Sequence, residues 1–600
     1  MRLLSLLLLA AIVIPACAPS PTHGAADALR AQLDQDWQYW MKEYPELATA
    51  VGYPGQNGRW TDYSDAAVDR RAQYLKESLQ HLLSIDPGQL AVNDQLNYDL
   101  YRDLIETAIA GLEFHNDAVP IRGVASFNLL MPVNQLDGVQ QSIPRAIAMM
   151  PAATVADYED IVSRLRSSGP LVDQTVALME RGIAAALTPP RITLRDLPAQ
   201  VSAQLVDDPL KSPMLEGFRS MPASIPEAER ARLTREAVDA YTQVVAPAFT
   251  KLRDFLVSRY LPACRETTAV SSLPNGASMY VYNVKWHTTT AMTPQEIHET
   301  GLAEVKRIRA EMDRVMAASG FTGSFQAFVA FLRTDPRFYF TDAASLLTAY
   351  RDIAKRADPE LATLFGVLPR TPYGVKAVPD AIAPSQTTAY YDPGSLVAAR
   401  PGNMFANTYK LDARPKWEME ALTLHEAVPG HHLQISLAQE RDDLPEFRKH
   451  SSFTAFVEGW GLYAESLGDE MGLYRNPYSK FGQLTYEMWR AVRLVIDTGL
   501  HSMGWSRDRA IAFFRANAAK TDQDIIVEVD RYIVWPGQAL GYKIGQLKIR
   551  ELRTNAERAL GPRFNIRQFH DVVLGQGAVP LDALEREVNA WIGRAAKPAS

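Results

Sequence analysis

The amino-acid sequence predicts a mainly α-helical fold with a small β-sheet. In the first half of the chain, long segments have apolar residues at helical spacing and are separated by prolines. Residues 227–259 illustrate the pattern, with Leu233, Ala237 and Tyr241 on one apolar stripe and Pro247 as an expected kink or break. The second half is again largely helical. With 600 residues, of which 47% are hydrophobic, the chain can bury a large core.

Two short stretches have the alternation and the aromatic content of strands. They are residues 278–282, Ser-Met-Tyr-Val-Tyr, and residues 404–409, Met-Phe-Ala-Asn-Thr-Tyr. The second stretch closely precedes a histidine-rich motif, so we expect the small sheet to lie near that motif.

A capping box marks the start of one helix. Residues 293–296, Thr-Pro-Gln-Glu, place a capping threonine and glutamate around a proline that suits the first helical position. They predict a helix from Pro294 with His298 on its surface. Because no second histidine follows nearby, we interpret the dipeptide His298-Glu299 as structural.

The chain begins with the features of an export signal. One early arginine, about twelve apolar residues and a small residue before Cys17 form this pattern. About twelve apolar residues cannot span a bilayer core, which needs about twenty. Residues 14–17, Ile-Pro-Ala-Cys, resemble a bacterial lipoprotein box. We therefore expect residues 1–16 to be a signal peptide and Cys17 to be lipidated, with ordinary cleavage after Ala16 as the alternative.

The expected mature chain has a linker at residues 17–26, a helical half at 27–270, and a helical half at 271–600 that carries the metal site. Once Cys17 is assigned to lipidation, only Cys264 remains, so no internal disulfide can form. Nothing else in the sequence indicates a thiol enzyme. The net charge of −7 argues against nucleic acid as a partner, because phosphates select basic patches.

The motif HEAVPGHH, residues 425–432, places three of the 11 histidines and one glutamate within eight positions. Imidazoles and carboxylates are typical zinc ligands, and a neighbouring glutamate can take a proton from water at a hydrolytic centre. The motif therefore predicts a Zn²⁺ site with His425 as a ligand and Glu426 as the general base.

The spacing of the second histidine differs from the usual His-Glu-x-x-His. Position i+4 is Pro429, and the next histidines are His431 and His432. On a straight helix His432 would lie roughly 10 Å beyond His425, at about 1.5 Å per residue, which is too far for one ion. Proline followed by Gly430 predicts a bulge or break in the helix. This break favours His431 as the second ligand, with His432 as the alternative.

A carboxylate ligand is expected from residues 453–472, an apolar helical segment that contains Glu458 and Glu465. Seven residues apart, both glutamates share one helix face. We expect Glu458 to be the third ligand and Glu465 to be an outer partner or an alternative ligand.

Four motifs in the second half of the chain resemble those of a known protein family. HEAVPGHHLQ, FVEGWGLYAE, RLVIDTGLHSMGWS and RYIVWPGQALGYKIGQLKIRELR, within residues 390–553, resemble a family of bacterial exported proteins regarded as zinc-metallopeptidase-like. Its presumed architecture is similar to that of the helical, clam-shaped peptidases of the carboxypeptidase Taq and angiotensin-converting enzyme type. The resemblance implies a gluzincin-type site in a deep channel between two helical halves.

The resemblance also implies roles for residues away from the metal motif. A tyrosine from a late helix faces the metal in such peptidases, often with a partner about ten residues earlier. Tyr542 fits this place as the donor to the oxyanion. Further candidates for contact with substrate are Tyr532, Lys543, His501 and, by strand addition next to the metal helix, Asn407.

The leading hypothesis is a zinc-dependent hydrolase that cleaves short peptides in the cell envelope or outside the cell. A non-haem iron oxygenase is an alternative, because two histidines and one carboxylate also form its facial triad. A second alternative is an exported lipoprotein that binds metal or peptide without turnover. The sequence leaves open the substrate, the terminus attacked and the oligomeric state.

Overall fold

The computed structural model describes residues 24–597 apart from residues 122, 124–126, 381–382 and 397–399. The fold is mainly α-helical with one small three-stranded sheet, which confirms the predicted fold class. The expected signal peptide 1–16 and Cys17 lie outside the described residues. None of the described helices combines the length and the apolar character needed to cross a membrane.

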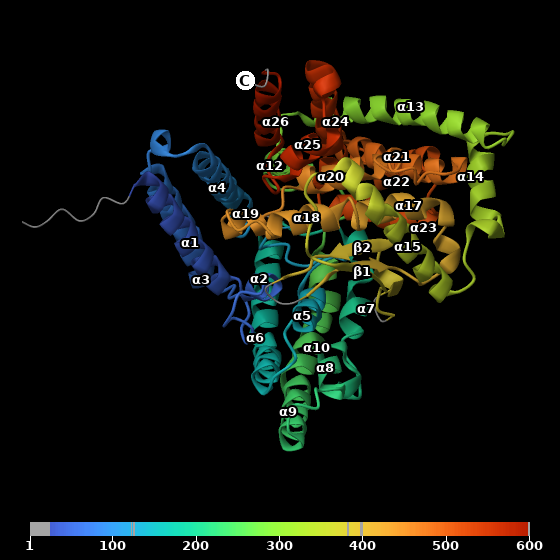
Figure 1. Cartoon of the computed structure of the whole chain (residues 1–600). Coiled ribbons are helices and arrows are strands. Elements are labelled where there is room, and N and C mark those ends of the chain that lie inside the picture. Colours follow the sequence, from blue (N-terminus) through green and yellow to red (C-terminus); the bar gives the residue numbers. More distant parts are fainter. Residues whose placement is uncertain (1–23, 122, 124–126, 381–382, 397–399, 598–600) are drawn as a thin grey trace, which may run out of the picture.

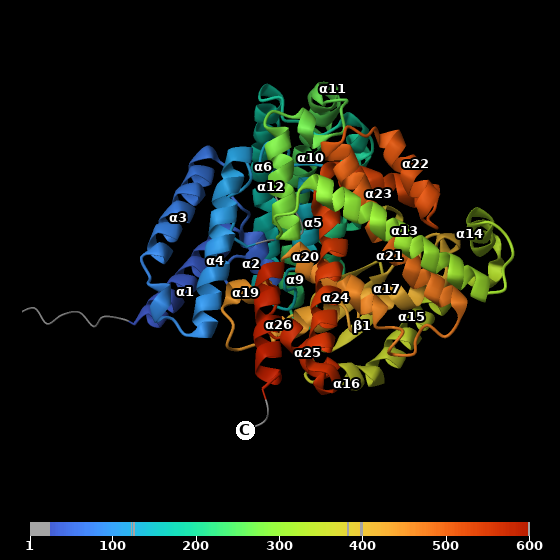
Figure 2. The ribbon, with the colours of Figure 1, turned by 90° about the horizontal axis from the view of Figure 1, so that it is seen from above.

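The first helices form an arm on one side of the molecule (Figure 1). Helices α1, α3 and α4 pack against one another and lie side by side in Figure 2. The arm consists of α1 (Ala25–Glu43), α2 (Pro45–Val51), α3 (Asp65–Leu83) and α4 (Val92–Gly111).

A second group of helices extends away from the rest of the body, at the bottom of Figure 1. It consists of α5 (Val139–Ala148), α6 (Val155–Ala184), α7 (Leu197–Ser202), α8 (Glu216–Arg219), α9 (Glu227–Ala240), α10 (Ala246–Phe255) and α11 (Leu261–Ala263). The break expected at Pro247 does not occur. A π-helical turn at Tyr241–Val245 joins α9 to α10, and this wider turn accommodates a proline that cannot donate to the α-helical ladder.

The third group contains α12 (Gly276–Thr288), α13 (Pro294–Ala318), α14 (Phe325–Thr334), α15 (Ala343–Ala357) and α16 (Leu361–Leu364). The strand predicted at residues 278–282 is wrong, because these residues lie inside α12. The capping box at Thr293 and Glu296 is confirmed. The prediction of a surface His298 is wrong: α13 packs along α21, so His298 is buried and its Nδ1 lies 2.8 Å from Oγ1 of Thr498.

The sheet contains β1 (Tyr373–Ala377), β2 (Ala389–Asp392) and β3 (Gly402–Ala406) in the order β1-β3-β2. Strand β3 is central, parallel to β1 and antiparallel to β2. It contains the first part of the predicted strand 404–409. The sheet shares one hydrophobic cluster with α15 and α17, which confirms a small sheet beside the histidine-rich motif (Figure 1).

The remaining helices build the part of the body that surrounds the motif (Figure 1). They are α17 (Met419–Glu426), α18 (His431–Gln439), α19 (Glu446–His450), α20 (Thr454–Ser466), α21 (Pro477–Ser502), α22 (Arg507–Asn517), α23 (Asp522–Val534), α24 (Gly541–Leu560), α25 (Ile566–Leu574) and α26 (Leu581–Ala595).

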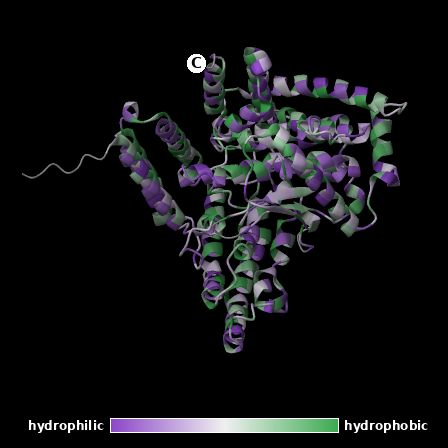
Figure 3. Cartoon of the chain, in the orientation of Figure 1, coloured by the Kyte–Doolittle hydropathy of each residue, from purple (hydrophilic) through white to green (hydrophobic). Residues whose placement is uncertain are grey.

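The largest hydrophobic cluster runs through the whole chain, from Leu29 in α1 to Trp591 in α26. It therefore contains residues from both expected halves, 27–270 and 271–600. A second cluster lies almost entirely within α5–α11. Many helices carry hydrophilic and hydrophobic residues side by side, as expected for amphipathic helices that cover these cores (Figure 3).

Candidate metal centre

The histidine-rich motif forms a turn between two helices. Helix α17 ends at Glu426, and α18 begins at His431. The helix therefore breaks at Pro429 and Gly430, as predicted; the Val428–Pro429 peptide bond is cis. Nε1 of Trp460 donates to the carbonyl of Pro429 at 2.8 Å and so fixes the turn to α20.

Only glycine fits at the end of this turn. A Cβ atom at Gly430 would lie 1.9 Å from the carbonyl oxygen of His425. The close approach folds α18 back onto the end of α17. As a result the imidazole rings of His425 and His431 lie 4.7 Å apart, at an interplanar angle of 87°.

Glu458 from α20 completes a group of three ligand-type side chains with His425 and His431. Its Oε2 lies 3.4 Å from Nε2 of His425 and 3.5 Å from Nε2 of His431. Ligand atoms bound tetrahedrally at about 2.0–2.2 Å from zinc are roughly 3.3–3.6 Å apart. Buried Oε2 of Glu458 has no hydrogen-bond partner among the described residues. The residues present therefore fit a tetrahedral Zn²⁺ ion.

Glu465 lies outside this group and orients one member of it. Nδ1 of His425 lies 2.8 Å from Oε1 of Glu465, a fully buried carboxylate. If Nδ1 donates to this oxygen, Nε2 of His425 keeps its lone pair for a metal. Of the two roles expected for Glu465, outer partner or alternative ligand, this geometry matches the outer partner.

The predicted ligand Glu458 and the predicted base Glu426 have different electrostatic environments. Burial alone would raise the pKa of Glu458, but the imidazoles of His425 and His431 outweigh it and hold this pKa well below the usual range. Burial raises the pKa of Glu426, although both imidazoles oppose the shift. A permanently ionised carboxylate suits a metal ligand, and a carboxylate with a raised pKa suits a general base.

His432 points away from the group. Its Nδ1 lies 2.8 Å from the hydroxyl of Tyr391, and its Nε2 lies 3.1 Å from the carbonyl of Thr371. Burial lowers the pKa of His432 to about 4, so the ring is neutral. Both nitrogens are occupied, and His432 is held as a structural residue beside β2.

Tyr542 lies beside the group, at the start of α24. Its ring is stacked on the ring of His425, with the centroids 6.4 Å apart. Its hydroxyl accepts a hydrogen bond from Nη2 of Arg531 at 3.1 Å, which leaves the hydroxyl hydrogen available as a donor.

Two predicted substrate contacts from neighbouring helices are wrong, because their polar atoms are already bonded. His501 is fully buried; its Nδ1 accepts from the backbone N–H of Val270, and its Nε2 lies 2.9 Å from the carbonyl of Tyr532. The hydroxyl of Tyr532 accepts from Nε1 of Trp489 at 2.9 Å and from Nε of Arg493 at 3.0 Å, and its own hydrogen is used in a bond to Glu528.

The other two predicted substrate contacts are also wrong. Lys543 is fully buried, with its Nζ 2.8 Å from carboxylate oxygens of both Glu304 and Glu487. Asn407 is fully buried as well. Its amide donates to three backbone carbonyls between residues 383 and 387, and its Oδ1 accepts from the N–H of Tyr409. Asn407 therefore holds the segment that precedes β2. Strand β3 is paired on both sides, so it has no edge for a peptide.

A cavity of about 550 Å³ opens beside the metal-ligand group. His431 and Glu458 line it together with the end of β2, at Tyr391 and Asp392, and the turn residue Gln538. This cavity gives a ligand access to the group.

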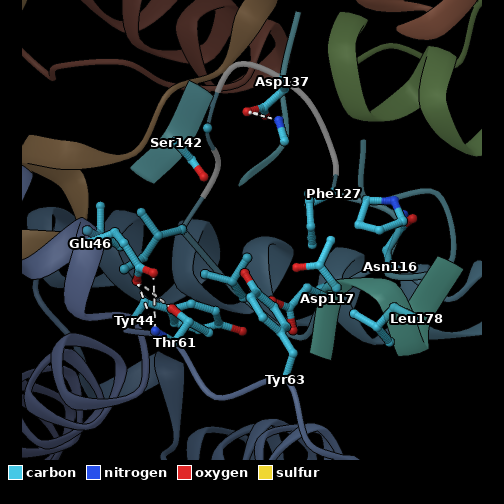
Figure 4. A pocket seen from close by; sticks show the side chains of 18 of the residues that line it. Tyr44, Glu46, Thr61, Tyr63, Asn116, Asp117, Phe127, Asp137, Ser142 and Leu178 are labelled. Atoms are coloured by element: carbon cyan, nitrogen blue, oxygen red, sulfur yellow. Dashed lines mark hydrogen bonds between the residues drawn. The ribbon is translucent and has the colours of Figure 1, made fainter. Parts of the chain in front are cut away.

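Two other cavities lie elsewhere, around the loop that follows α4. None of the predicted site residues lines either of them. In the cavity of Figure 4, Glu46 bonds to Thr61, and Asp117 lies beside Tyr63. The buried Asp117 carboxylate is paired with Arg71 at 3.4 Å.

Cys264 is buried and makes no disulfide within the described chain. Burial raises the pKa of its thiol to about 12, which removes the thiolate needed for nucleophilic chemistry.

A group of polar side chains on the Tyr542 side of the centre was not predicted from the sequence: Arg490, Arg493, Arg531 and Gln538. A pair of small-residue repeats was not predicted either, Ala455-x-x-x-Gly459 in α20 and Gly541-x-x-x-Gly545 in α24. These repeats allow two helix backbones to touch, and their spacing could have identified the contact.

The fold and the site define a large helical protein with a buried two-histidine, one-glutamate centre formed by α17, α18 and α20. The chain belongs to the family described as "Bacterial protein of unknown function (DUF885)", whose model matches residues 45–588. No curated protein matches the chain.

Solved structures are similar over almost the whole length. One is described as "the putative lipoprotein from Colwellia psychrerythraea"; it is 28% identical, with a TM-score of 0.89, and the match covers 95% of this chain and 100% of that one. Another is described as "a putative lipoprotein of unknown function from Shewanella oneidensis", 16% identical, with a TM-score of 0.68 and coverage of 94% and 99%. The second shows likeness of fold alone.

Proposed function

We propose that this protein is an exported, zinc-dependent hydrolase that cleaves peptide bonds of short peptides. The observation that carries the proposal is the position of Oε2 of Glu458, 3.4 and 3.5 Å from the Nε2 atoms of His425 and His431. Three ligand atoms so arranged leave a fourth tetrahedral position for water or substrate, as catalytic zinc sites do.

The residues around this centre have separate tasks. Zinc would polarise a carbonyl group and lower the pKa of water at the site. The carboxylate of Glu426, whose pKa is raised by burial, takes the proton of the attacking water and passes it to the leaving amine. Glu465 holds the His425 ring in one orientation. Tyr542 offers its hydroxyl hydrogen to the oxyanion.

The position of β2 supports a peptide as the substrate. Strand β2 is an outer strand of the sheet, and its residues Tyr391 and Asp392 line the cavity that contains His431 and Glu458. An extended peptide in this cavity lies beside the strand and can pair with its backbone. This edge replaces the one expected at residues 404–409.

Export and attachment through a lipid on Cys17 are part of the proposal. The pattern of residues 1–17 supports it, as does the description of the structure from Colwellia psychrerythraea as a "putative lipoprotein". The protein would then meet peptides in the cell envelope. Labelled fatty acid should enter the wild type but not Cys17→Ser; equal labelling of both would contradict attachment through this residue.

Metal analysis of the purified mature protein, followed by turnover of a mixed peptide library, tests the function. We expect one zinc per chain and cleavage that stops when zinc is chelated and returns when it is restored. Iron in place of zinc would support the oxygenase alternative. Zinc or peptide binding with no cleavage would support a binding lipoprotein instead.

A further inference from the structure

Three arginines lie around Tyr542. Arg490 and Arg493 come from one face of α21, and Arg531 comes from α23. The guanidinium carbon of Arg493 lies 4.4 Å from the centre of the Tyr542 ring, and that of Arg490 lies 5.7 Å from it. Because the same ring is stacked on His425, the positive charges gather next to the metal centre.

Too few carboxylates neutralise these arginines within the described chain. Glu528 lies 3.0 Å from Arg493 and 3.6 Å from Arg531. Within 4 Å, the described carboxylate partner of Arg490 is Glu465, at 3.5 Å, and the same oxygen of Glu465 lies 2.8 Å from Nδ1 of His425. The charge of Arg490 also acts on Glu426, which lies outside ion-pair distance. Three buried cations thus share two carboxylates, one of which is committed to a ligand histidine.

Two buried lysines of this protein are compensated more fully than these arginines. Lys543 lies 2.8 Å from both Glu304 and Glu487, and Lys520 lies 2.8 Å from Glu418. Burying a charge without a partner is costly, so the deficit at the arginines indicates a missing anionic group.

Unused hydrogen-bond donors mark where this group would bind. The following buried nitrogens have no acceptor among the residues that the structure describes: Nε of Arg490, Nη1 of Arg493, Nε of Arg531 and Nε2 of Gln538. Gln538, Arg493 and Arg490 are 1%, 2% and 5% exposed, and the side chain of Arg531 is 15% exposed. Buried N–H groups are normally paired, so four unpaired donors close together need an explanation.

Gln538 connects this group of donors to the cavity beside the metal centre. It lines the cavity with His431 and Glu458. Nη2 of Arg531 donates to Oε1 of Gln538 at 2.9 Å and to the hydroxyl of Tyr542 at 3.1 Å. Since its oxygen is occupied, the polar atom of Gln538 that has no partner among the described residues is the donor Nε2.

We propose that Arg490, Arg493, Arg531 and Gln538 form a binding site for a carboxylate group of the substrate, next to the metal centre. The site rests on the proposed function and defines its substrate class: peptides that carry a carboxylate close to the bond that is cleaved. Guanidinium groups and an amide N–H match the geometry and charge of a carboxylate. The carboxylate belongs either to the C-terminus of the peptide or to an acidic side chain.

Binding of matched peptides to the zinc-loaded Glu426→Gln protein tests the site without turnover. One pair is acetyl-Ala-Ala-Ala as the free acid and as the C-terminal amide; the other is acetyl-Ala-Glu-Ala amide and acetyl-Ala-Gln-Ala amide. By titration calorimetry, the acid member of one pair should bind at least about 10-fold more tightly, as expected for hydrogen bonds to a charged group. The pair that shows the preference identifies the source of the carboxylate.

Variants of the site should remove this preference. In the same background, Arg531→Gln should weaken the acid and leave the amide nearly unchanged. Gln538→Glu is a second variant that keeps the size of the side chain and repels the carboxylate. Arg515→Gln is the matched control and should keep the full preference, because Arg515, on α22, forms an exposed ion pair with Asp522.

Equal affinity within both pairs, or a preference that survives both Arg531→Gln and Gln538→Glu, would overturn the proposed site. Its failure is distinguishable from failure of the hydrolase proposal. Zinc-dependent cleavage by the wild type without any acid preference removes only the carboxylate site. An acid preference in a protein that never cleaves peptides leaves the site and removes the hydrolase.

Discussion

Gly545 of α24 lies directly against the backbone of Ala455 in α20: a Cβ atom at position 545 would be 1.7 Å from the Ala455 carbonyl oxygen. Gly459, one turn further along α20, meets the backbone of Gly545 as well. This contact sets the distance between the helix that carries Glu458 and the helix that carries Tyr542.

Gly545→Ala should therefore force α20 and α24 apart. Overpacking of this kind typically costs about 1–3 kcal/mol of unfolding free energy. We expect a lower melting temperature and weaker zinc binding, measured by thermal unfolding and by competition with a chelator. The control is Gly593→Ala in α26, where nothing lies within 4 Å of the added atom. Wild-type stability in Gly545→Ala would mean that the helices can separate at no cost.

His425→Ala and His431→Ala should each abolish the zinc equivalent, because each removes one of three ligand atoms. His432→Ala should keep it, since both nitrogens of His432 are bonded to Tyr391 and Thr371. The measurement is zinc per chain after dialysis. If His431→Ala keeps one zinc per chain, or if only His432→Ala loses it, the second ligand is His432 and not His431.

Glu426→Gln should keep its zinc and lose nearly all hydrolysis. Glutamine has the same shape but cannot take the proton of water, and loss of a general base typically costs on the order of 10²–10⁴-fold in rate. The peptide that the wild type cleaves best is the probe for steady-state kinetics. Turnover close to that of the wild type would exclude Glu426 as the base.

Tyr542→Phe should lower turnover by on the order of 10²-fold or more while zinc content and melting temperature stay near wild type. Tyr532→Phe is the contrasting variant. It leaves the donors of Trp489 and Arg493 unpaired, so it should lose about 1–3 kcal/mol of stability and retain zinc. Unchanged kinetics in Tyr542→Phe would limit this tyrosine to packing on His425.

The stability of the protein should depend on pH through Asp497, which fixes the turn before α24 by accepting from Tyr280 and from the N–H of Gly537. Burial raises the pKa of Asp497 to about 7, although these hydrogen bonds oppose the shift. The unfolded pKa is about 3.9, so the folded state binds the proton more tightly. The stabilising contribution is complete below about pH 4 and is lost as the pH rises through 7.

Asp497→Asn removes this titration and keeps one acceptor oxygen. The melting temperature of the wild type minus that of the variant should therefore be lower at pH 8 than at pH 5. Asp582→Asn on the exposed side of α26 controls for general charge effects. A difference between wild type and Asp497→Asn that stays constant from pH 5 to pH 8 would contradict the raised pKa.

Short sequence motifs predicted helix starts and breaks correctly where tertiary packing kept the locally preferred structure. The capping box at residues 293–296 and the break at residues 429–430 are examples. The error at residues 278–282 came from a short window, because alternation over five residues does not separate a strand from a helix. The buried residues Met279, Tyr280, Asn283, Val284 and His287 show helical spacing over the whole of α12. The error at His298 came from tertiary packing, since only contact with α21 buries that face of α13.

For the site, the sequence predicted the side chains that the structure brings together near the motif: His425, His431, Glu458 and Glu465. It failed for Asn407, His501, Tyr532 and Lys543 because residue type cannot show whether a polar atom is already bonded. The arginines of α21 and α23 were missed for a related reason. Their shortage of partners is a property of three helices together, and no single stretch of sequence contains it.

The turn at Ala427–Gly430 also bears on how such centres are recognised. The pattern His-Glu-x-x-His encodes the repeat of a helix, whereas an ion requires only that donor atoms converge. Here a turn of four residues separates the two helices that supply the histidines, so a search that demands a four-residue interval passes over this chain. A comparison of distances between imidazole nitrogens and carboxylate oxygens would detect both arrangements.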